Sequence, residues 1–203
     1  MTRKRDETIL FLPGERGERA LRARLAAGED AAYRDCYQQH APKLMRLLVG
    51  ILRNKARAEE ILQETFIAAF RGIAGFRGEV SLATWLARIA TNRAYNAIRD
   101  ESRAKRTAPP QEEEPVSSFE PRVEGRDLAR KVMVILDQMD PVKKLALLLQ
   151  AEGYSVAEIA EICAEPRGTI LARLSRSRAE LSLRMAEAGL VAQATSAGVE
   201  GHS

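Results

Sequence analysis

ARAEEILQETFIAAFR, residues 56–71, has apolar side chains at the spacing of one face of an α-helix. The apolar positions that share this face are Ile61, Leu62, Phe66, Ala69 and Phe70. The opposite face is polar and mostly acidic, with Glu59, Glu60, Gln63 and Glu64. The stretch therefore predicts an amphipathic helix that ends at Gly72 and buries its apolar face against other helices.

The same helical spacing recurs along most of the chain, and no segment alternates for long enough to predict a strand. Before the quoted stretch, helices are predicted at residues 19–27 and 30–53, with Pro42 beginning or kinking the later half of the second. After it, a helix is predicted at residues 81–103, with Ser81 as its N-cap. These four helices are expected to form one domain, residues 18–106, and residues 1–17 are expected to be disordered.

Residues 107–125, TAPPQEEEPVSSFEPRVEG, interrupt the helical pattern with four prolines and three consecutive glutamates. Such a stretch cannot bury enough apolar surface to order itself, so it predicts a flexible linker. Residues 126–187 return to helical spacing and predict a second domain, and residues 188–203, rich in Gly, Ala and Ser, predict a disordered tail. The expected fold is all-α, with two small helical domains joined by the linker.

Composition excludes several classes of protein. The 203 residues are 45% hydrophobic, which excludes wholesale disorder, and no apolar run approaches the length of a membrane helix. Two cysteines and two histidines exclude a disulfide scaffold and a zinc cluster, so we expect a cytoplasmic protein without metal or cofactor. A net charge of +4 favours a polyanionic partner without deciding for one. Cys36 and His40 are the only candidate nucleophile–base pair, and we interpret them as structural.

The helix predicted at residues 81–103 has a second, polar stripe. Its members recur every third or fourth residue: Trp85, Arg88, Asn92, Asn96 and Arg99. Rings stack on bases, guanidinium groups contact phosphates and amides read base edges, so this stripe favours single-stranded DNA. The alternative is that Trp85 belongs to the core and the polar stripe is merely solvated. Just before it, the residues Phe76, Arg77, Gly78 and Glu79 predict a loop that can approach a nucleotide closely.

The second domain contains a predicted helix-turn-helix. Asp140 and Pro141 begin one helix, Ser155 and Glu158 form a capping box that begins a short helix, and Pro166 begins a longer one after a turn at residues 163–165. Ala160 and Ile170 are the small and buried residues that the motif needs. The outward positions of the longer helix are Leu171, Ala172, Ser175, Arg176 and Arg178.

The outward arginines favour duplex DNA as the partner of this motif. Arg176 can pair with guanine in the major groove, whereas Arg167 and Arg178 suit phosphate contacts. The alternative is a plain helical hairpin with a solvated basic face.

Three stretches in order, GEDAAYRDCYQQHAPKLMRLL, ARAEEILQETFIAAFRGIAGF and FRGEVSLATWLARIATNRAYNAIRD, resemble domain 2 of sigma-70-type sigma factors of the extracytoplasmic-function group, over residues 25–103. The resemblance implies that the AEEILQETF helix docks on the clamp helices of RNA polymerase, through Glu60, Gln63, Glu64 and Phe66, with Phe66 also part of the core. It implies that the loop and the next helix bind the −10 element through Phe76, Arg77, Trp85, Arg88, Asn92, Asn96 and Arg99. Many relatives carry Asp at position 96, so Asn96 is expected to change base preference.

GYSVAEIAEICAEPRGTILARLSRSRAELSLRM resembles sigma domain 4, which binds the −35 element and the polymerase flap, over residues 127–185. The implied DNA contacts are Arg167, Thr169, Leu171, Ala172, Ser175, Arg176 and Arg178. Three residues depart from the family pattern. Ala164 replaces the usual turn glycine, which costs about 1 kcal/mol if the position is left-handed. Leu171 and Ala172 replace polar residues, so we expect a relaxed or altered −35 preference.

The resemblance implies a sigma factor that directs core RNA polymerase to promoter DNA and helps melt the −10 element. An anti-sigma factor that masks both domains, at the inner membrane face, is a further implied partner. Glu112, Glu113 and Glu114 then either mimic RNA phosphates or belong to a solvated spacer. The competing hypothesis is a conventional helix-turn-helix regulator that acts without replacing the sigma subunit. An enzyme with a small-molecule substrate is not indicated, because the sequence has no phosphate-binding loop or metal-ligand set.

Overall fold

The computed structural model describes residues 13–107 and 126–190, which form eight α-helices and one 3-10 turn and contain no strand. In chain order these elements are α1 (Pro13–Ala26), α2 (Asp30–Leu52), α3 (Lys55–Gly72), η1 (Ile73–Gly75), α4 (Leu82–Thr107), α5 (Arg126–Asp137), α6 (Pro141–Ala151), α7 (Val156–Cys163) and α8 (Arg167–Glu187). The prediction of an all-helical chain is therefore confirmed. The glutamates at 112–114, with the role expected for them, lie outside the described residues.

The ends of the helices differ from the prediction at three places. α1 begins at Pro13, so residues 13–17 are helical rather than disordered; proline suits this position because the first turn needs no N–H donor. α4 continues to Thr107, one residue into the predicted linker. At the C-terminus, Leu190 is buried and its N–H donates to the Met185 carbonyl at 2.9 Å, so the first residues of the predicted tail close α8.

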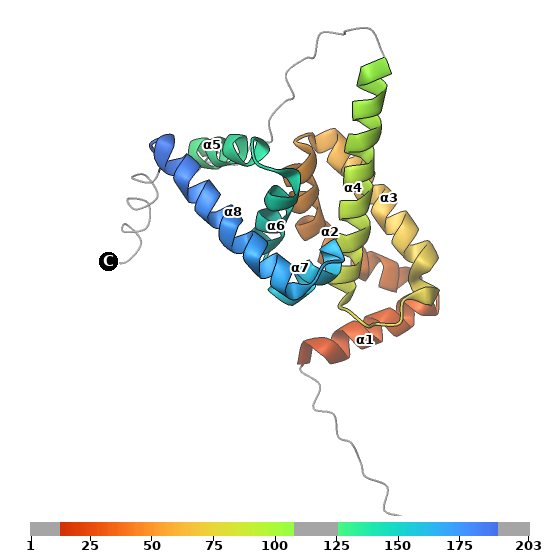
Figure 1. The fold of residues 1–203 in the computed structure, drawn as a ribbon. Coiled ribbons are helices and arrows are strands. Elements are labelled where there is room, and N and C mark those ends of the chain that lie inside the picture. The colour runs from red at the N-terminus through yellow and green to blue at the C-terminus, as the bar shows by residue number, and fades with distance from the viewer. Residues whose placement is uncertain (1–12, 108–125, 191–203) are drawn as a thin grey trace, which may run out of the picture.

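The N-terminal body consists of α2, α3 and α4, with α1 lying across one end (Figure 1). The predicted apolar face of α3 is buried, and Phe70 is half-buried. α4 buries Leu82, Leu86, Ala90 and Ala97 against it. Ser81 caps α4 as predicted, since its hydroxyl accepts the Thr84 N–H at 3.1 Å. These packed faces hold the polar sides of α3 and α4 at the surface.

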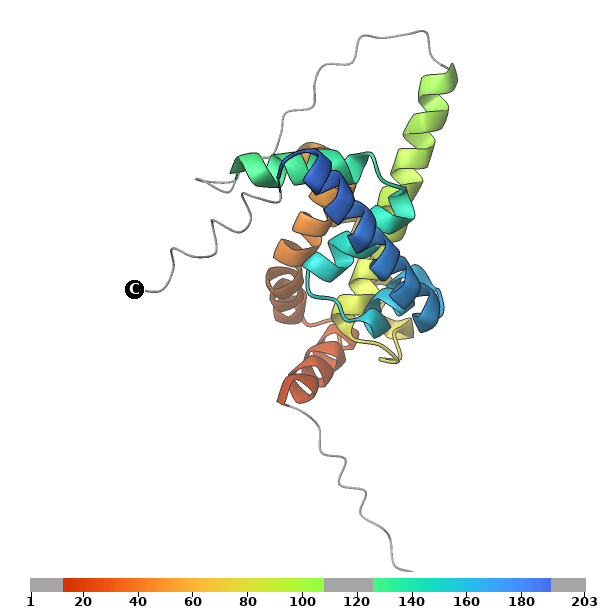
Figure 2. The same cartoon turned by 60° about the vertical axis from the view of Figure 1, so that its left-hand side comes forward.

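The C-terminal body consists of α5 to α8, and α8 runs across both α6 and α5 (Figure 2). Asp140 caps α6 by accepting the N–H groups of Val142 and Lys143, and Ser155 and Glu158 form the predicted capping box of α7. Pro166 is the N-cap of α8 rather than its first residue. Ile170 and Leu174 are buried, as the helix-turn-helix pattern predicts.

The two bodies pack against each other through α2 with α6 and through α4 with α7, an arrangement that the sequence pattern did not predict. Leu148 of α6 lies on Gly50 of α2, where a Cβ on the glycine would come within 3.0 Å of the leucine side chain. The ring of Tyr154, between α6 and α7, is buried with the Lys43 ammonium 3.6 Å from its centroid. Apolar residues of both bodies therefore form one continuous core.

Candidate nucleic-acid and polymerase interfaces

The loop between α3 and α4 carries the aromatic part of the first candidate site. The Phe76 ring stacks on the Trp85 ring, with centroids 4.6 Å apart and planes inclined by 18°. Gly78 turns the loop with a φ of +77°, which an L side chain rarely adopts. A cleft of about 670 Å³ opens beside the stack and is lined by Gly72, Gly75, Phe76, Arg77, Glu79, Val80, Trp85, Arg88 and Glu161.

The predicted polar stripe of α4 is a continuous exposed row. Arg88, Asn92, Asn96 and Arg99 are all exposed, and the Arg99 guanidinium donates to the Asn96 side-chain oxygen at 2.7 Å. Trp85 is half-buried, so its ring both packs on the core and borders the cleft. The structure therefore brings the two aromatic residues, Arg77 and Arg88 together in one cleft, and the remaining stripe residues extend from it along α4.

The candidate polymerase surface on α3 is acidic and partly paired. Glu60 binds Arg57 at 2.5 Å, Glu64 binds Arg93 of α4 at 2.7 Å, and Gln63 is exposed. Phe66 is only 3% exposed and packs between the rings of Tyr37 and Phe70, so it supports this face from within and is not part of it. Two exposed apolar residues that sequence reasoning did not select are Tyr37 of α2 and Ile67 of α3.

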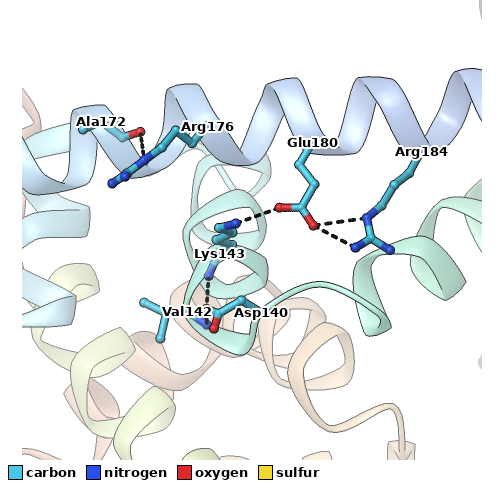
Figure 3. A network of polar contacts seen from close by, with 7 residues as sticks. All are labelled: Asp140, Val142, Lys143, Ala172, Arg176, Glu180 and Arg184. Carbon is cyan, nitrogen blue, oxygen red and sulfur yellow. Dashed lines mark hydrogen bonds and ion pairs between the residues drawn. The ribbon is translucent and has the colours of Figure 1, made fainter.

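The helix-turn-helix forms the third candidate site. All seven predicted contact residues are exposed: Arg167, Thr169, Leu171, Ala172, Ser175, Arg176 and Arg178. Arg176 folds back to donate to the Ala172 carbonyl at 3.3 Å (Figure 3), and Arg178 donates to Gln150 at 3.0 Å. Leu171, 57% exposed, gives the row an apolar centre. The face is therefore basic at its ends and apolar in the middle, as the departures at positions 171 and 172 predict.

An ion-pair network fixes α8 against the rest of the body. Glu180 of α8 accepts from Lys143 of α6 at 2.8 Å and from Arg184, one turn further along α8 (Figure 3). The backbone N–H of Lys143 in turn donates to the capping residue Asp140. Both cations lower the pKa of Glu180, with Lys143 the larger cause. The network holds the C-terminal half of α8 on α6. In the other half Ile170 and Leu174 are buried, and the predicted contact residues lie on the exposed face.

The remaining candidate chemistry is inert. Burial raises the pKa of Cys36 to about 11. Burial also lowers the pKa of His40, and the nearby charge of Lys43 lowers it further. At neutral pH the thiol is therefore protonated and the imidazole neutral, which leaves no activated nucleophile. In the described ranges, no three His, Cys, Asp or Glu side chains are grouped as metal ligands. Within those ranges, too, no helix has the length and apolar character needed to cross a membrane.

Each of the two bodies matches a known protein family. Residues 36–104 match Sigma-70 region 2, and residues 129–181 match Sigma-70, region 4. The ECF RNA polymerase sigma factor SigM of Mycobacterium tuberculosis is 29% identical over 170 residues, covering 83% of this chain and 84% of that protein. The ECF RNA polymerase sigma-E factor of Haemophilus influenzae is 30% identical over 177 residues, covering 79% and 91%.

Two solved structures share the fold. CnrH, solved in complex with the cytosolic domain of CnrY, has a TM-score of 0.65 and 22% identity, over 84% of this chain and 97% of that one. RpoE of Bartonella quintana, solved with the anti-sigma factor NepR, has a TM-score of 0.65 and 25% identity, over 73% of this chain and 93% of that one.

The two family matches contain all three candidate sites, α3 and α4 in the first and α7 and α8 in the second. A conventional helix-turn-helix regulator would account for the second match alone, so that alternative is excluded. The chain belongs to the sigma-70 family of RNA polymerase sigma factors, in its extracytoplasmic-function group, and acts in promoter-specific initiation of transcription.

Proposed function

We propose that the cleft at Phe76 and Trp85, together with the polar stripe of α4, binds the melted −10 strand. Arg77 and Arg88 are exposed at the cleft and contact phosphates, while Phe76 and Trp85 stack with a base. Asn92, Asn96 and Arg99 then meet the next nucleotides along α4. The observation that carries the proposal is the stacked aromatic pair at the mouth of an open cleft, with cations on the same side.

We propose that the exposed face of α8 enters the major groove at the −35 element. Arg176 reaches a guanine after releasing the Ala172 carbonyl, and Arg167 and Arg178 bind flanking phosphates. Thr169 and Ser175 supply hydroxyls at the edges of this face. Leu171 and Ala172 offer only apolar contact, which suits thymine methyl groups, so fewer bases are fixed by hydrogen bonds. The −35 preference is therefore relaxed or altered relative to the group.

We propose that the acidic face of α3 binds the clamp helices of core RNA polymerase through Glu60, Gln63 and Glu64. The carboxylates of Glu60 and Glu64 already pair with Arg57 and Arg93, and a basic partner can replace such exposed pairs at a small cost in free energy. The C-terminal body binds the flap. Phe66 contributes by holding α3 against α2 rather than by contact with the polymerase.

The protein acts in the cytoplasm as a binding subunit, without catalysing a covalent step itself. Bartonella quintana RpoE is bound by the anti-sigma factor NepR, and an anti-sigma factor at the inner membrane face is the regulator that we propose here. Its docking would cover the polymerase-binding faces of both bodies.

The test is co-elution of the purified chain with core RNA polymerase, followed by run-off transcription from a randomised promoter pool. We expect co-elution and transcripts that depend on promoter sequence. Trp85→Ala should abolish open-complex formation, and Arg176→Ala should weaken duplex binding at the −35 element. Arg130→Ala, at an exposed position of α5, removes a charge outside all three sites and serves as control. Failure to co-elute, or transcripts indifferent to the first two substitutions, would contradict the assignment.

A further inference from the structure

Helix α1 lies before the residues that match the sigma-70 region 2 family, yet it packs beside the loop that begins α4 (Figure 1). Glu18 of α1 accepts the backbone N–H of Leu82, the first residue of α4, at 2.5 Å. This N–H is one of the donors that a helix start leaves without an intrahelical partner. A carboxylate at that position accepts the hydrogen bond from this N–H. Its negative charge also interacts favourably with the positive end of the helix dipole. α1 therefore holds the start of the helix that carries the Trp85 stripe.

Arg22, one turn along α1 from Glu18, reaches the loop itself. Its guanidinium carbon lies 5.7 Å from the centroid of the Phe76 ring. A Cβ built on Gly78 would fall 1.3 Å from Arg22 Nη1, so the guanidinium lies directly against the glycine backbone. The positive φ and the missing side chain of Gly78 thus make room for an arginine from a separate helix.

The guanidinium of Arg22 lies against Phe76 and Gly78 and, among the described residues, not against a carboxylate. In the described part of the chain, no carboxylate lies within ion-pair distance of its guanidinium, whereas Arg24, two residues on, pairs with Glu29 and Asp35. A guanidinium can lie over an aromatic ring and still present its edge donors to a phosphate. The partner of Phe76 in that ring stack, Trp85, borders the cleft in which the DNA strand would lie.

We propose that Arg22 is a further contact of this protein to the −10 strand, binding a backbone phosphate next to the base that stacks at Phe76 and Trp85. Glu18 is the positioning residue that holds the loop and the start of α4 for this contact. The proposal rests on the −10 assignment made above. Because phosphates carry no sequence information, Arg22 adds affinity and salt dependence without changing base preference.

The experiment measures binding of a −10 single strand, selected from the promoter pool, to holoenzyme assembled from core RNA polymerase and each variant, across a salt series. Arg22→Gln should lower affinity roughly 3- to 10-fold and reduce the slope of log K against log salt by about 0.7, the value for one phosphate contact on a single strand. Arg22→Lys keeps the charge and should keep the slope. Arg24→Gln, which removes the same charge from the same helix, should leave both quantities unchanged.

The outcomes separate this proposal from the one that it rests on. If wild-type holoenzyme does not bind the strand, or if Trp85→Ala binds as well as wild type, the −10 assignment itself fails. If Trp85→Ala loses binding while Arg22→Gln keeps the wild-type affinity and slope, only the role of Arg22 is overturned. A change of preferred bases in Arg22→Gln would also overturn it.

The role of Glu18 is tested with two substitutions of its own. Glu18→Gln retains a side-chain oxygen for the Leu82 N–H and should bind the strand almost as wild type does, whereas Glu18→Ala should weaken binding without altering the salt slope. Equal binding by both variants and wild type would show that Glu18 has no positioning role. Thermal unfolding of each variant distinguishes loss of the contact from loss of the fold, and Arg22→Lys keeps the test decisive if Arg22→Gln is unstable.

Discussion

Replacing Ala164 by glycine should stabilise the C-terminal body. Ala164 ends α7 in the left-handed conformation, with φ +54° and ψ +45°. Its N–H and that of Glu165 donate to the last carbonyls of α7, so the turn cannot relax without losing these hydrogen bonds. The alanine is exposed, and its methyl group therefore contributes little burial that a glycine would forfeit.

The magnitude follows from two opposing contributions. A non-glycine residue in the left-handed region costs about 1–2 kcal/mol. Glycine also has more conformational freedom in the unfolded chain, which lowers the free energy of unfolding by about 0.4–1 kcal/mol. Ala164→Gly should therefore raise the free energy of unfolding by about 0.5–1 kcal/mol. For a chain of this length that corresponds to roughly 1–4 °C in Tm.

Urea unfolding of the full chain, followed by helical circular dichroism, measures this difference. The midpoint should rise while the slope stays constant, since the surface exposed on unfolding is unchanged. Ala179→Gly is the matched control: Ala179 is exposed within α8, and there the same substitution should lower stability by about 1 kcal/mol. A destabilised Ala164→Gly variant would refute the argument from backbone strain.

Four further substitutions, of which Leu183→Ala is a control, have expected outcomes. Ser177→Ala should stabilise the chain by roughly 1 kcal/mol in the same urea assay, because the Ser177 hydroxyl is buried without a hydrogen-bond partner; a loss of stability would mean that the hydroxyl is satisfied. Leu148→Ala should cost about 1–2 kcal/mol by removing the side chain packed on Gly50. Leu183→Ala, at an exposed site, should cost almost nothing. Glu158→Gln should make the free energy of unfolding depend less steeply on pH in the acid range. Burial alone would raise the pKa of Glu158, but hydrogen bonds from Ser155 and Thr84 outweigh it and the pKa is lowered. A lowered folded-state pKa gives stability that is present above the usual glutamate range and is lost as pH falls through the lowered value. Urea midpoints from about pH 6 to pH 3 test this, and parallel curves for both proteins would contradict it.

The helices could be predicted because their signals are local. The apolar face of α3, the capping box at Ser155 and Glu158, and the Asp140–Pro141 start of α6 each lie within a few adjacent residues. The end of α4 was predicted too early for a physical reason as well. Residues 104–107, AKRT, contain three strong helix formers, and the first helix-breaking residue is Pro109.

The candidate sites could be predicted where one helix carries them and not where two elements meet. The stripe of α4 and the outward face of α8 follow from spacing alone, and both are exposed apart from the half-buried Trp85. Phe66 had both a core and a surface assignment, and the helical period gave the correct one. The contact of Arg22 with Phe76 joins residues on separate elements, and no spacing in the sequence signals it.

The packing of the two bodies is the feature most remote from sequence signals, and its energetics bear on how the protein works. The pair Arg46–Glu152 crosses the boundary at 2.9 Å, but the arginine side chain is 59% exposed, so the pair contributes only about 0.2–1 kcal/mol. The hydrogen bond from Tyr95 to the Pro141 carbonyl is likewise at the surface. The apolar contribution comes from the core that both bodies share, in which Leu148 lies on Gly50 and Tyr154 is buried between α6 and α7.

Interfaces between domains of one chain often resemble transient protein–protein interfaces, so a sufficient gain in binding free energy elsewhere can open them. The proposed function needs such a gain. Glu161 of α7 lines the same cleft as Arg88 and Trp85, so a DNA phosphate entering the cleft meets a like charge while the bodies stay packed. In the proposed function, binding of each body to its own promoter element would move α7 away from α4 and remove that repulsion. The exposed ion pairs of the interface oppose this separation only weakly, whereas the apolar contacts at the boundary, such as that of Leu148 with Gly50, oppose it most.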